Sequence, residues 1–279
     1  MPDVDTPRYV QRDQPDGVPP LELTGERTLP DVPEENYWYR RHLVVYEWIA
    51  DRVATRAVAA QQGTARKGAG ADVRVVDLAC GEGYGSAVLA RRATHVVGVD
   101  ANPEAHEHAR LRYVADNLRF DRDLVETWEG DVDVVVFLQT IEHVQDPDAL
   151  LARLATLAGP DGEVIVSTPN LLTLAPEGAE KSENPWHIKE YRAGEYRELL
   201  ERHFSHVEIH GLFHARKLAL HQTAIERLGW DRVHKALRLT KPFYAWFTPA
   251  IATSDFALRR PEDGADLDRA LDFVAVVRP

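Results

Sequence analysis

Three polar side chains that could take part in chemistry occur within five residues, at Gln139, Glu142 and His143. Their i, i+3, i+4 spacing would bring all three to one side of a helical turn. They follow residues 132–138, an apolar run typical of a buried strand, and ligands bind at the carboxyl ends of parallel strands. Imidazole titrates near neutrality, so we predict that His143, together with Glu142, takes a proton from a substrate. The alternative is that both residues only cap a helix and hydrogen-bond the backbone.

A glycine turn and a distal acid form a second candidate site. Residues 73–85 begin as a valine-rich run, which ends at Asp77 and is followed by a glycine turn. Such runs are typical of strands buried on both faces of a parallel sheet, and glycine lets the backbone approach a ligand closely. The next apolar run closes on Asp100, whose carboxylate could accept hydrogen bonds from both hydroxyls of a ribose. Together they predict a site for a cofactor that contains a nucleoside.

The class of cofactor depends on the sixth position of the turn. Dinucleotide-binding proteins have glycine there in G-x-G-x-x-G, whereas this chain has Ser86. Asp77 lies four residues before the first glycine, where it could receive a cationic amine. The run from Asp77 to Gly83 resembles the first motif of class I S-adenosylmethionine-dependent methyltransferases. The alternative is a glycine turn that only packs a strand against a helix.

This resemblance implies S-adenosylmethionine as the cofactor. In that family Asp100 would hold the ribose, and Asp123 and Leu124 would meet the adenine edge. Arg41 could close over the cofactor carboxylate, because a guanidinium fork matches a carboxylate, although a surface arginine explains it equally well. The full set of residues expected at the cofactor is Asp77, Ala79, Gly81, Gly83, Tyr84, Asp100, Ala101, Asp123, Leu124, Gln139 and Arg41.

A second resemblance concerns metal ions. Small-RNA 3′-terminal 2′-O-methyltransferases and some quinone-precursor O-methyltransferases bind a divalent ion through Glu-x-x-Glu-His and a distant histidine. This chain is similar at Glu142, His143 and His187 but has Gln139 in place of the first glutamate. An amide oxygen can ligate Mg²⁺ with less charge than a carboxylate, and the mixed donor set would also suit Mn²⁺ or Zn²⁺. Metal assistance and a metal-free His143 base both stay open.

A narrower resemblance extends along most of the chain. Its signatures are residues 23–30, 35–42, 80–85, 139–143, 184–187, 211–214 and 253–256, together with the closing strand. They resemble actinobacterial sugar O-methyltransferases, in particular the 6-O-methyltransferases of mycobacterial methylglucose lipopolysaccharide. This implies methyl transfer to a sugar or oligosaccharide hydroxyl in polysaccharide biosynthesis. A phenolic or quinone-precursor O-methyltransferase is the alternative, and a non-catalytic S-adenosylmethionine-binding module is a third reading.

Composition favours a cytoplasmic enzyme. The net charge of −12 opposes a polyanionic partner such as nucleic acid or an anionic membrane surface, although a local basic patch would still be compatible with it. The single cysteine, Cys80, permits no internal disulfide and fits a reducing compartment. We expect no secretory leader and no membrane span, because no stretch has the required apolar length.

The order of the elements predicts an α/β fold. Strands alternate with helices, which indicates a Rossmann-like, mostly parallel seven-stranded sheet covered by helices on both faces. The expected parts are an extended, partly disordered arm (1–35), an N-terminal helix and linker (36–70), a cofactor-binding core (71–210), a cap or substrate insertion (211–267) and the last strand (268–279). The aromatic patch at 242–247 is open to three readings: a platform for sugar rings, internal packing of the cap, or the seam of a homodimer.

Overall fold

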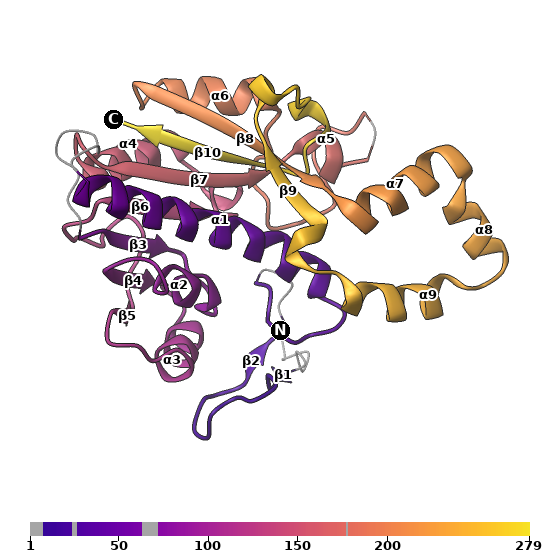
Figure 1. The fold of residues 1–279 in the computed structure, drawn as a ribbon, viewed down its shortest axis with the longest axis horizontal. Coiled ribbons are helices and arrows are strands. Elements are labelled where there is room, and N and C mark those ends of the chain that lie inside the picture. Colours follow the sequence, from indigo (N-terminus) through magenta and orange to yellow (C-terminus); the bar gives the residue numbers. More distant parts are fainter. Residues whose placement is uncertain (1–7, 24–26, 63–71, 177) are drawn as a thin grey trace.

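The computed structural model describes residues 8–23, 27–62, 72–176 and 178–279. Residues 1–7 of the arm that was expected to be partly disordered, and residues 63–70 of the expected linker, lie outside this part of the chain. An eight-stranded sheet forms the centre of the molecule (Figure 1). Its spatial order is β5 (Leu118–Asp121), β4 (His95–Val99), β3 (Arg74–Leu78), β6 (Val134–Leu138), β7 (Glu163–Pro169), β10 (Asp272–Arg278), β8 (His206–His214) and β9 (Phe256–Arg259).

The direction of the strands divides the sheet into two parts. Strands β5, β4, β3, β6 and β7 are parallel, whereas β10 runs antiparallel between β7 and β8. The predicted Rossmann-like, mostly parallel fold is confirmed. The expected number of seven strands is wrong, because β9 adds an eighth strand antiparallel to β8. This strand lies within the segment that the sequence indicated as a cap.

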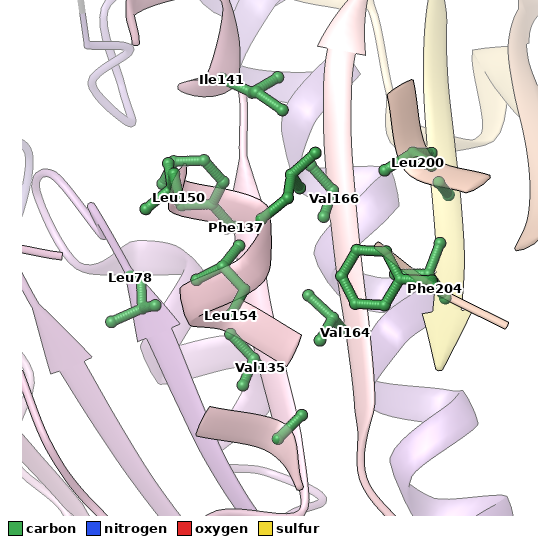
Figure 2. Packing of buried hydrophobic residues seen from close by; sticks show 14 of the residues in the cluster. Leu78, Val135, Phe137, Ile141, Leu150, Leu154, Val164, Val166, Leu200 and Phe204 are labelled. Atoms are coloured by element: carbon green, nitrogen blue, oxygen red, sulfur yellow. The ribbon is translucent and has the colours of Figure 1, made fainter. Parts of the chain in front are cut away.

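Helices cover both faces of the sheet. They are α1 (Asn36–Gln61), α2 (Tyr84–Leu89), α3 (Pro103–Arg112), α4 (Pro147–Ala158), α5 (Leu171–Leu174) and α6 (Ala193–Glu201). Alternate residues of each strand point to opposite faces, so one face packs on α1 and α2 and the other on α4 and α6. Figure 2 shows the second of these layers, in which Phe137 and Val166 of the sheet meet Leu154 of α4.

Local signals explain where two of these helices begin. The Asn102 side chain accepts hydrogen bonds from the first N–H groups of α3, and Asp146 does the same for α4. Each cap is followed by proline at the first helical position, where its missing N–H costs nothing. The caps therefore fix where the chain turns after β4 and β6. These two turns carry candidate site residues.

The N-terminal arm is ordered where it is described. Strands β1 (Arg8–Tyr9) and β2 (Leu21–Glu22) pair antiparallel. Gln11 Nε2 donates to the buried carboxylate of Glu82 at 2.6 Å, and the Pro19 carbonyl contacts His108 Nδ1 of α3 at 2.7 Å. The arm is therefore attached to the glycine turn and to α3.

Three helices between β8 and β9 form a projection that we call the arch, residues 216–247. It consists of α7 (Arg216–Leu228), α8 (Trp230–Ala236) and α9 (Thr240–Phe247). In Figure 1, α7 leads away from the sheet, α8 is at the far end and α9 returns. The chain also contains five short 3-10 turns. The first follows β6, and the other four follow the arch: η1 (Ile141–His143), η2 (Thr248–Ala250), η3 (Thr253–Asp255), η4 (Pro261–Asp263) and η5 (Leu267–Arg269). Within the described residues, no helix combines the length and apolar character needed to cross a membrane.

Candidate functional site

Two adjoining cavities lie at the carboxyl ends of β3, β4 and β6. The first has a volume of about 260 Å³ and is lined by Arg27, Thr28, His42, Tyr46, Ala79, Cys80, Gly81, Glu82, Tyr84, Asp100, Leu138, Gln139, Thr140 and His143. The second has a volume of about 530 Å³ and is lined by Arg27, Thr28, Glu34, Glu35, Trp38, Arg41, His42, Gln139, Glu142, His143, Pro169, Leu174, Ser182, Glu183, Asn184 and His187. Five residues border both and form a shared wall: Arg27, Thr28, His42, Gln139 and His143.

The glycine turn forms the floor of the first cavity. Gly81 has φ +56°, and a Cβ added there would meet no atom within 4 Å, because this position faces open space. Gly83 has φ +95°, and a Cβ there would lie only 2.8 Å from the Cβ of Ala109 in α3. The first glycine therefore leaves room for a ligand, whereas the second permits the helix to pack closely.

Asp100 lies beside the turn, as the sequence predicts. One carboxylate oxygen accepts from the Gly81 N–H at 2.8 Å, and the other accepts from the Asn102 N–H at 2.9 Å. Burial raises the pKa of this carboxyl, and the two N–H groups oppose the shift. The side chain is held in one orientation at the cavity wall, where it could bind a diol.

Asp77, the expected receptor of a cationic amine, lies near the end of β3. It is completely buried beneath the turn and accepts hydrogen bonds from Ser86 Oγ at 2.7 Å and Tyr46 Oη at 3.2 Å. Burial raises its pKa to about 7. Asp77 does not line the first cavity, and its two hydrogen bonds support the turn. Its expected contact with a cationic amine stays a prediction. Ser86, which donates one of these hydrogen bonds to Asp77, is the residue that stands where a dinucleotide-binding motif would have glycine.

The residues expected at the adenine lie away from the first cavity. Asp123 Oδ1 accepts from the Leu124 N–H at 2.8 Å and from Thr127 Oγ1 at 2.6 Å, and Leu124 is exposed. Ala101 is exposed as well. None of the three lines the cavity as the structure describes it. Ala79, Gly81, Tyr84, Asp100 and Gln139 are the predicted cofactor residues that do line it.

The structure brings Glu142, His143 and His187 together in the second cavity. One potential ligand atom from each residue lies within 4.8 Å of the others. The loop that carries His187 is fixed there, because Ile188 N–H donates to the Glu142 carbonyl at 2.7 Å and His143 Nδ1 contacts the Trp186 carbonyl at 3.1 Å. Residues 44 positions apart in the sequence thus form one donor cluster.

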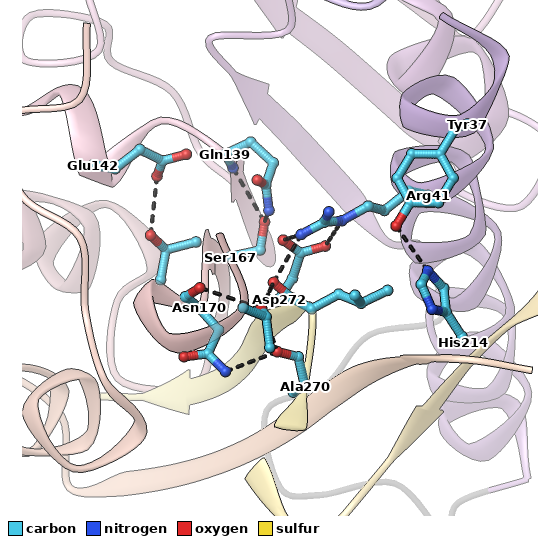
Figure 3. Close-up of polar contacts among 12 residues, drawn as sticks. Tyr37, Arg41, Gln139, Glu142, Ser167, Asn170, His214, Ala270 and Asp272 are labelled. Carbon is cyan, nitrogen blue, oxygen red and sulfur yellow. Dashed lines mark hydrogen bonds and ion pairs between the residues drawn. The ribbon is translucent and has the colours of Figure 1, made fainter. Parts of the chain in front are cut away.

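Burial controls the charge of this cluster. Glu142 accepts a hydrogen bond from Thr168 Oγ1 at 3.1 Å (Figure 3). Desolvation raises its pKa to about 8, and the nearby carboxylates of Asp272 and Glu190 add to the shift. A buried carboxyl in this state is stabilised as an anion by an adjacent cation.

Glu190 orients His187, a relation that sequence reasoning missed. Its carboxylate contacts His187 Nδ1 at 2.6 Å and accepts from the Ser182 N–H at 2.8 Å. The hydrogen bonds from Ser182 and His187 outweigh burial and lower the pKa of Glu190, so the carboxylate is ionised and fixes the proton on Nδ1. An Nδ1–H held by a carboxylate leaves Nε2 as the nitrogen that would bind a metal, the arrangement found in metal-binding histidines. The position of Glu190 three residues after His187 was the sequence signal that could have indicated this contact.

These donors fit a divalent cation. Ligands on opposite sides of one ion are about 4.2 Å apart when each bond is about 2.1 Å, which is close to the 4.8 Å within which the three ligand atoms lie. Gln139 borders the cluster with φ +49°, and its Nε2 donates to Ser167 Oγ at 3.0 Å. Two imidazoles, a carboxylate and a neutral amide form a donor set for Mn²⁺, Zn²⁺ or Mg²⁺.

Arg41 holds α1 against β10. Its Nε and Nη2 donate to the two carboxylate oxygens of Asp272 at 2.7 and 2.5 Å, and Nη2 also donates to the Leu271 carbonyl (Figure 3). Both side chains are almost completely buried. Arg41 lines the second cavity and not the first, and its expected contact with the cofactor carboxylate stays a prediction.

Replacing Arg41 with methionine should reduce the free energy of unfolding by about 3–5 kcal/mol, because Asp272 would be buried without its partner. Urea unfolding measures this loss. Arg52→Met is the matched control, since its partner Glu163 keeps a second cation in Arg278. If both variants lost the same free energy of unfolding, the loss in Arg41→Met could not be attributed to leaving Asp272 buried without a partner.

His42 and Thr28 border both cavities, although sequence reasoning gave neither a role. Thr28 Oγ1 lies 3.4 Å from His42 Nδ1 and 3.2 Å from the hydroxyl of Tyr84. Desolvation lowers the pKa of His42 to about 4, and the charge of Arg41 adds to the shift, so this imidazole is neutral at physiological pH. Its position depends on α1 and the arm meeting at the shared wall, which no local motif indicates.

Known proteins with similar sequences indicate the family of this chain. A family model described as "Methyltransferase domain" matches residues 37–223. A Mycolicibacterium smegmatis protein named "Probable S-adenosylmethionine-dependent methyltransferase" is 36% identical over 277 residues, which cover 95% of this chain and 99% of that protein. A Mycobacterium tuberculosis protein of the same description is 33% identical and covers 98% and 97%.

Two further similarities are less extensive. A ubiquinone biosynthesis O-methyltransferase of Psychrobacter arcticus is 36% identical over 132 residues, which cover 44% of this chain and 51% of that enzyme. The crystal structure of a SAM-dependent methyltransferase from Thermotoga maritima matches with a TM-score of 0.51 and 15% identity, over 88% of this chain and 95% of that one. At this identity the structural match supports the fold alone.

Proposed function

Because this chain belongs to the S-adenosylmethionine-dependent methyltransferases of the methyltransferase-domain family, we propose that it methylates a hydroxyl of a sugar or oligosaccharide. The reaction would serve the biosynthesis of a methylated polysaccharide in the cytoplasm. The observation that carries the proposal is the shared wall: a cofactor in the first cavity and an acceptor in the second would meet at His143.

The lining of the second cavity supports a saccharide acceptor. The side chains of Glu34, Glu35, Glu183 and Asn184 present oxygens that accept hydrogen bonds from hydroxyl groups. Trp38 adds an aromatic ring on which the C–H face of a sugar can stack. The excess of carboxylates disfavours an anionic acceptor such as RNA.

S-adenosylmethionine supplies a methyl group that is already activated by the sulfonium. The protein must hold that methyl in line with an acceptor oxygen and remove the proton of the oxygen. We assign the cofactor ribose to Asp100 and the backbone approach to Gly81. As the oxygen–methyl bond forms and the sulfur–methyl bond breaks, the electron pair goes to sulfur and the hydroxyl proton goes to His143.

In the metal-assisted form of this proposal, Glu142, His143 and His187 hold a divalent cation, with Gln139 beside them. Bound there, it would lower the pKa of the acceptor hydroxyl. His143 could not then take the proton. In this form the metal-bound hydroxyl would lose its proton to water, and His42, a neutral imidazole that lines the same cavity, could accept a hydrogen bond from the hydroxyl.

Removal of divalent ions tests the choice between the two forms. We expect exhaustive EDTA treatment followed by gel filtration to abolish methyl transfer, and Mg²⁺ or Mn²⁺ to restore it. His187→Ala should bind Mn²⁺ about 10- to 100-fold more weakly by calorimetry and bind the cofactor normally, since it does not line the first cavity. Full activity after chelation would remove the ion from the mechanism and leave His143 as the base.

A phenolic or quinone-precursor acceptor is the second candidate, favoured by the partial similarity to the ubiquinone biosynthesis O-methyltransferase. Methyl transfer from labelled cofactor to gluco- and manno-oligosaccharides and to catechols distinguishes the two. Linkage analysis of the product then identifies the hydroxyl. Transfer to catechols alone would replace the saccharide proposal.

A further inference from the structure

The charge of the arch is opposite to that of the rest of the chain. Residues 216–247 contain two acidic residues and seven basic ones, although the whole chain has a net charge of −12. The basic residues are Arg216, Lys217, Arg227, Arg232, Lys235, Arg238 and Lys241. Five of them lie between 227 and 241, in the part of the arch that includes α8. The acidic balance that opposed an anionic partner therefore does not apply to this segment.

Large apolar side chains are exposed among these cations. They are Leu220, Leu228, Val233, Leu237, Leu239 and Trp246, with exposed fractions between 41% and 77%. The arch has its own internal packing, in which Phe243 stacks on His221 and His234. The aromatic patch is thus divided: Phe243 and Phe247 pack inside the arch, whereas Trp246 is 71% exposed.

The far end of the arch, at α8, lies away from the sheet (Figure 1). Its base is joined to the core, where Lys217 pairs with Asp255 and Phe247 packs in the cluster that contains α1. Helix α7 has 13 residues and a length of about 20 Å, and it leads away from the sheet in Figure 1. Charges more than about 8 Å apart are largely screened at physiological ionic strength, so the core does not cancel the field at α8. Within the described residues, no part of the arch lines either site cavity.

We propose that the arch docks this protein onto an anionic lipid surface. Cations that approach lipid phosphates, with leucine and tryptophan side chains between them, are the composition of helices that lie in a membrane interface. The exposed apolar residues lie on α7, α8 and α9 and in the link between α8 and α9, and they alternate along the sequence with the cations. The docking does not depend on the acceptor that the enzyme methylates.

Sedimentation of the full-length protein with vesicles tests this proposal. We expect binding to vesicles of equal parts phosphatidylglycerol and phosphatidylcholine, little binding to pure phosphatidylcholine, and loss of binding at high salt. Arg232→Ser/Arg238→Ser should bind about 25-fold more weakly, at about fivefold for each cation removed. Trp246→Ala should bind about tenfold more weakly. Arg91→Ser/Arg122→Ser, which removes two exposed cations outside the arch, is the matched control.

Three results would overturn the proposal: no binding to anionic vesicles, equal binding to neutral ones, or equal losses in the arch and control variants. Concentration-dependent self-association that Trp246→Ala abolishes, without lipid binding, would assign the surface to a second copy of the chain. Methyl transfer to a water-soluble acceptor should be unchanged in every variant. Failure of docking is thereby separated from failure of the proposed reaction.

Discussion

Alanine in place of His143 is expected to reduce turnover about 10³-fold while the affinity for S-adenosylmethionine stays within about twofold of the original value. The imidazole stands in the shared wall, either as proton acceptor or as part of the Glu142–His187 cluster, and each role is worth orders of magnitude in rate. The cofactor's proposed contacts with the glycine turn and Asp100 are made elsewhere. Single-turnover kinetics and calorimetry measure the two quantities separately.

His206→Ala is the matched control for this experiment, because His206 is exposed at the start of β8 and lines neither cavity. It should leave both turnover and affinity unchanged. If His143→Ala weakened cofactor binding as much as it slowed turnover, the residue would be part of the cofactor site and its assignment to proton transfer would be wrong.

The second large effect is expected at Asp100. Its replacement by alanine should weaken S-adenosylmethionine binding by at least about 150-fold, because the two hydrogen bonds from the ribose hydroxyls to a carboxylate contribute about 1.5–3 kcal/mol each. The change also removes the acceptor of the Gly81 N–H, which positions the turn. Isothermal calorimetry with the cofactor and with its demethylated product measures the loss.

Asp116→Asn provides the control for Asp100, since it removes an exposed carboxylate of the same size away from the first cavity. Its affinity should equal that of the unaltered protein. A normal affinity in Asp100→Ala would refute the placement of the ribose. Strong binding of a nicotinamide dinucleotide in place of S-adenosylmethionine would refute the cofactor assignment altogether.

The sequence predicted the features of this molecule that depend on neighbouring residues in the chain. The buried strands follow from valine-rich runs. Local caps that the sequence analysis did not use, Asn102 and Asp146 each followed by proline, account for the starts of α3 and α4. The pairing of Glu142 with His143 follows from their adjacency in one turn. The location of Asp100 at the glycine turn follows from the rule that ligands bind at strand ends.

Contacts between distant segments could not be predicted in the same way. Arg41 matches a cofactor carboxylate as well as it matches Asp272, and its pairing with Asp272 follows only from the packing of α1 on β10. His42 and Thr28 acquire their place from the meeting of α1 with the arm. Strand β9 has only four residues, and its pairing with β8 cannot be inferred from so short a segment.

The antiparallel strand β10 has a consequence for how the protein is made. It lies between β7 and β8, yet it follows both in the sequence by more than fifty residues. While the ribosome is still translating the arch, the facing edges of β7 and β8 have no partner and offer free N–H and C=O groups. A nascent chain that pauses there is a target for aggregation or chaperone capture, and emergence of residues 272–278 ends that vulnerable interval.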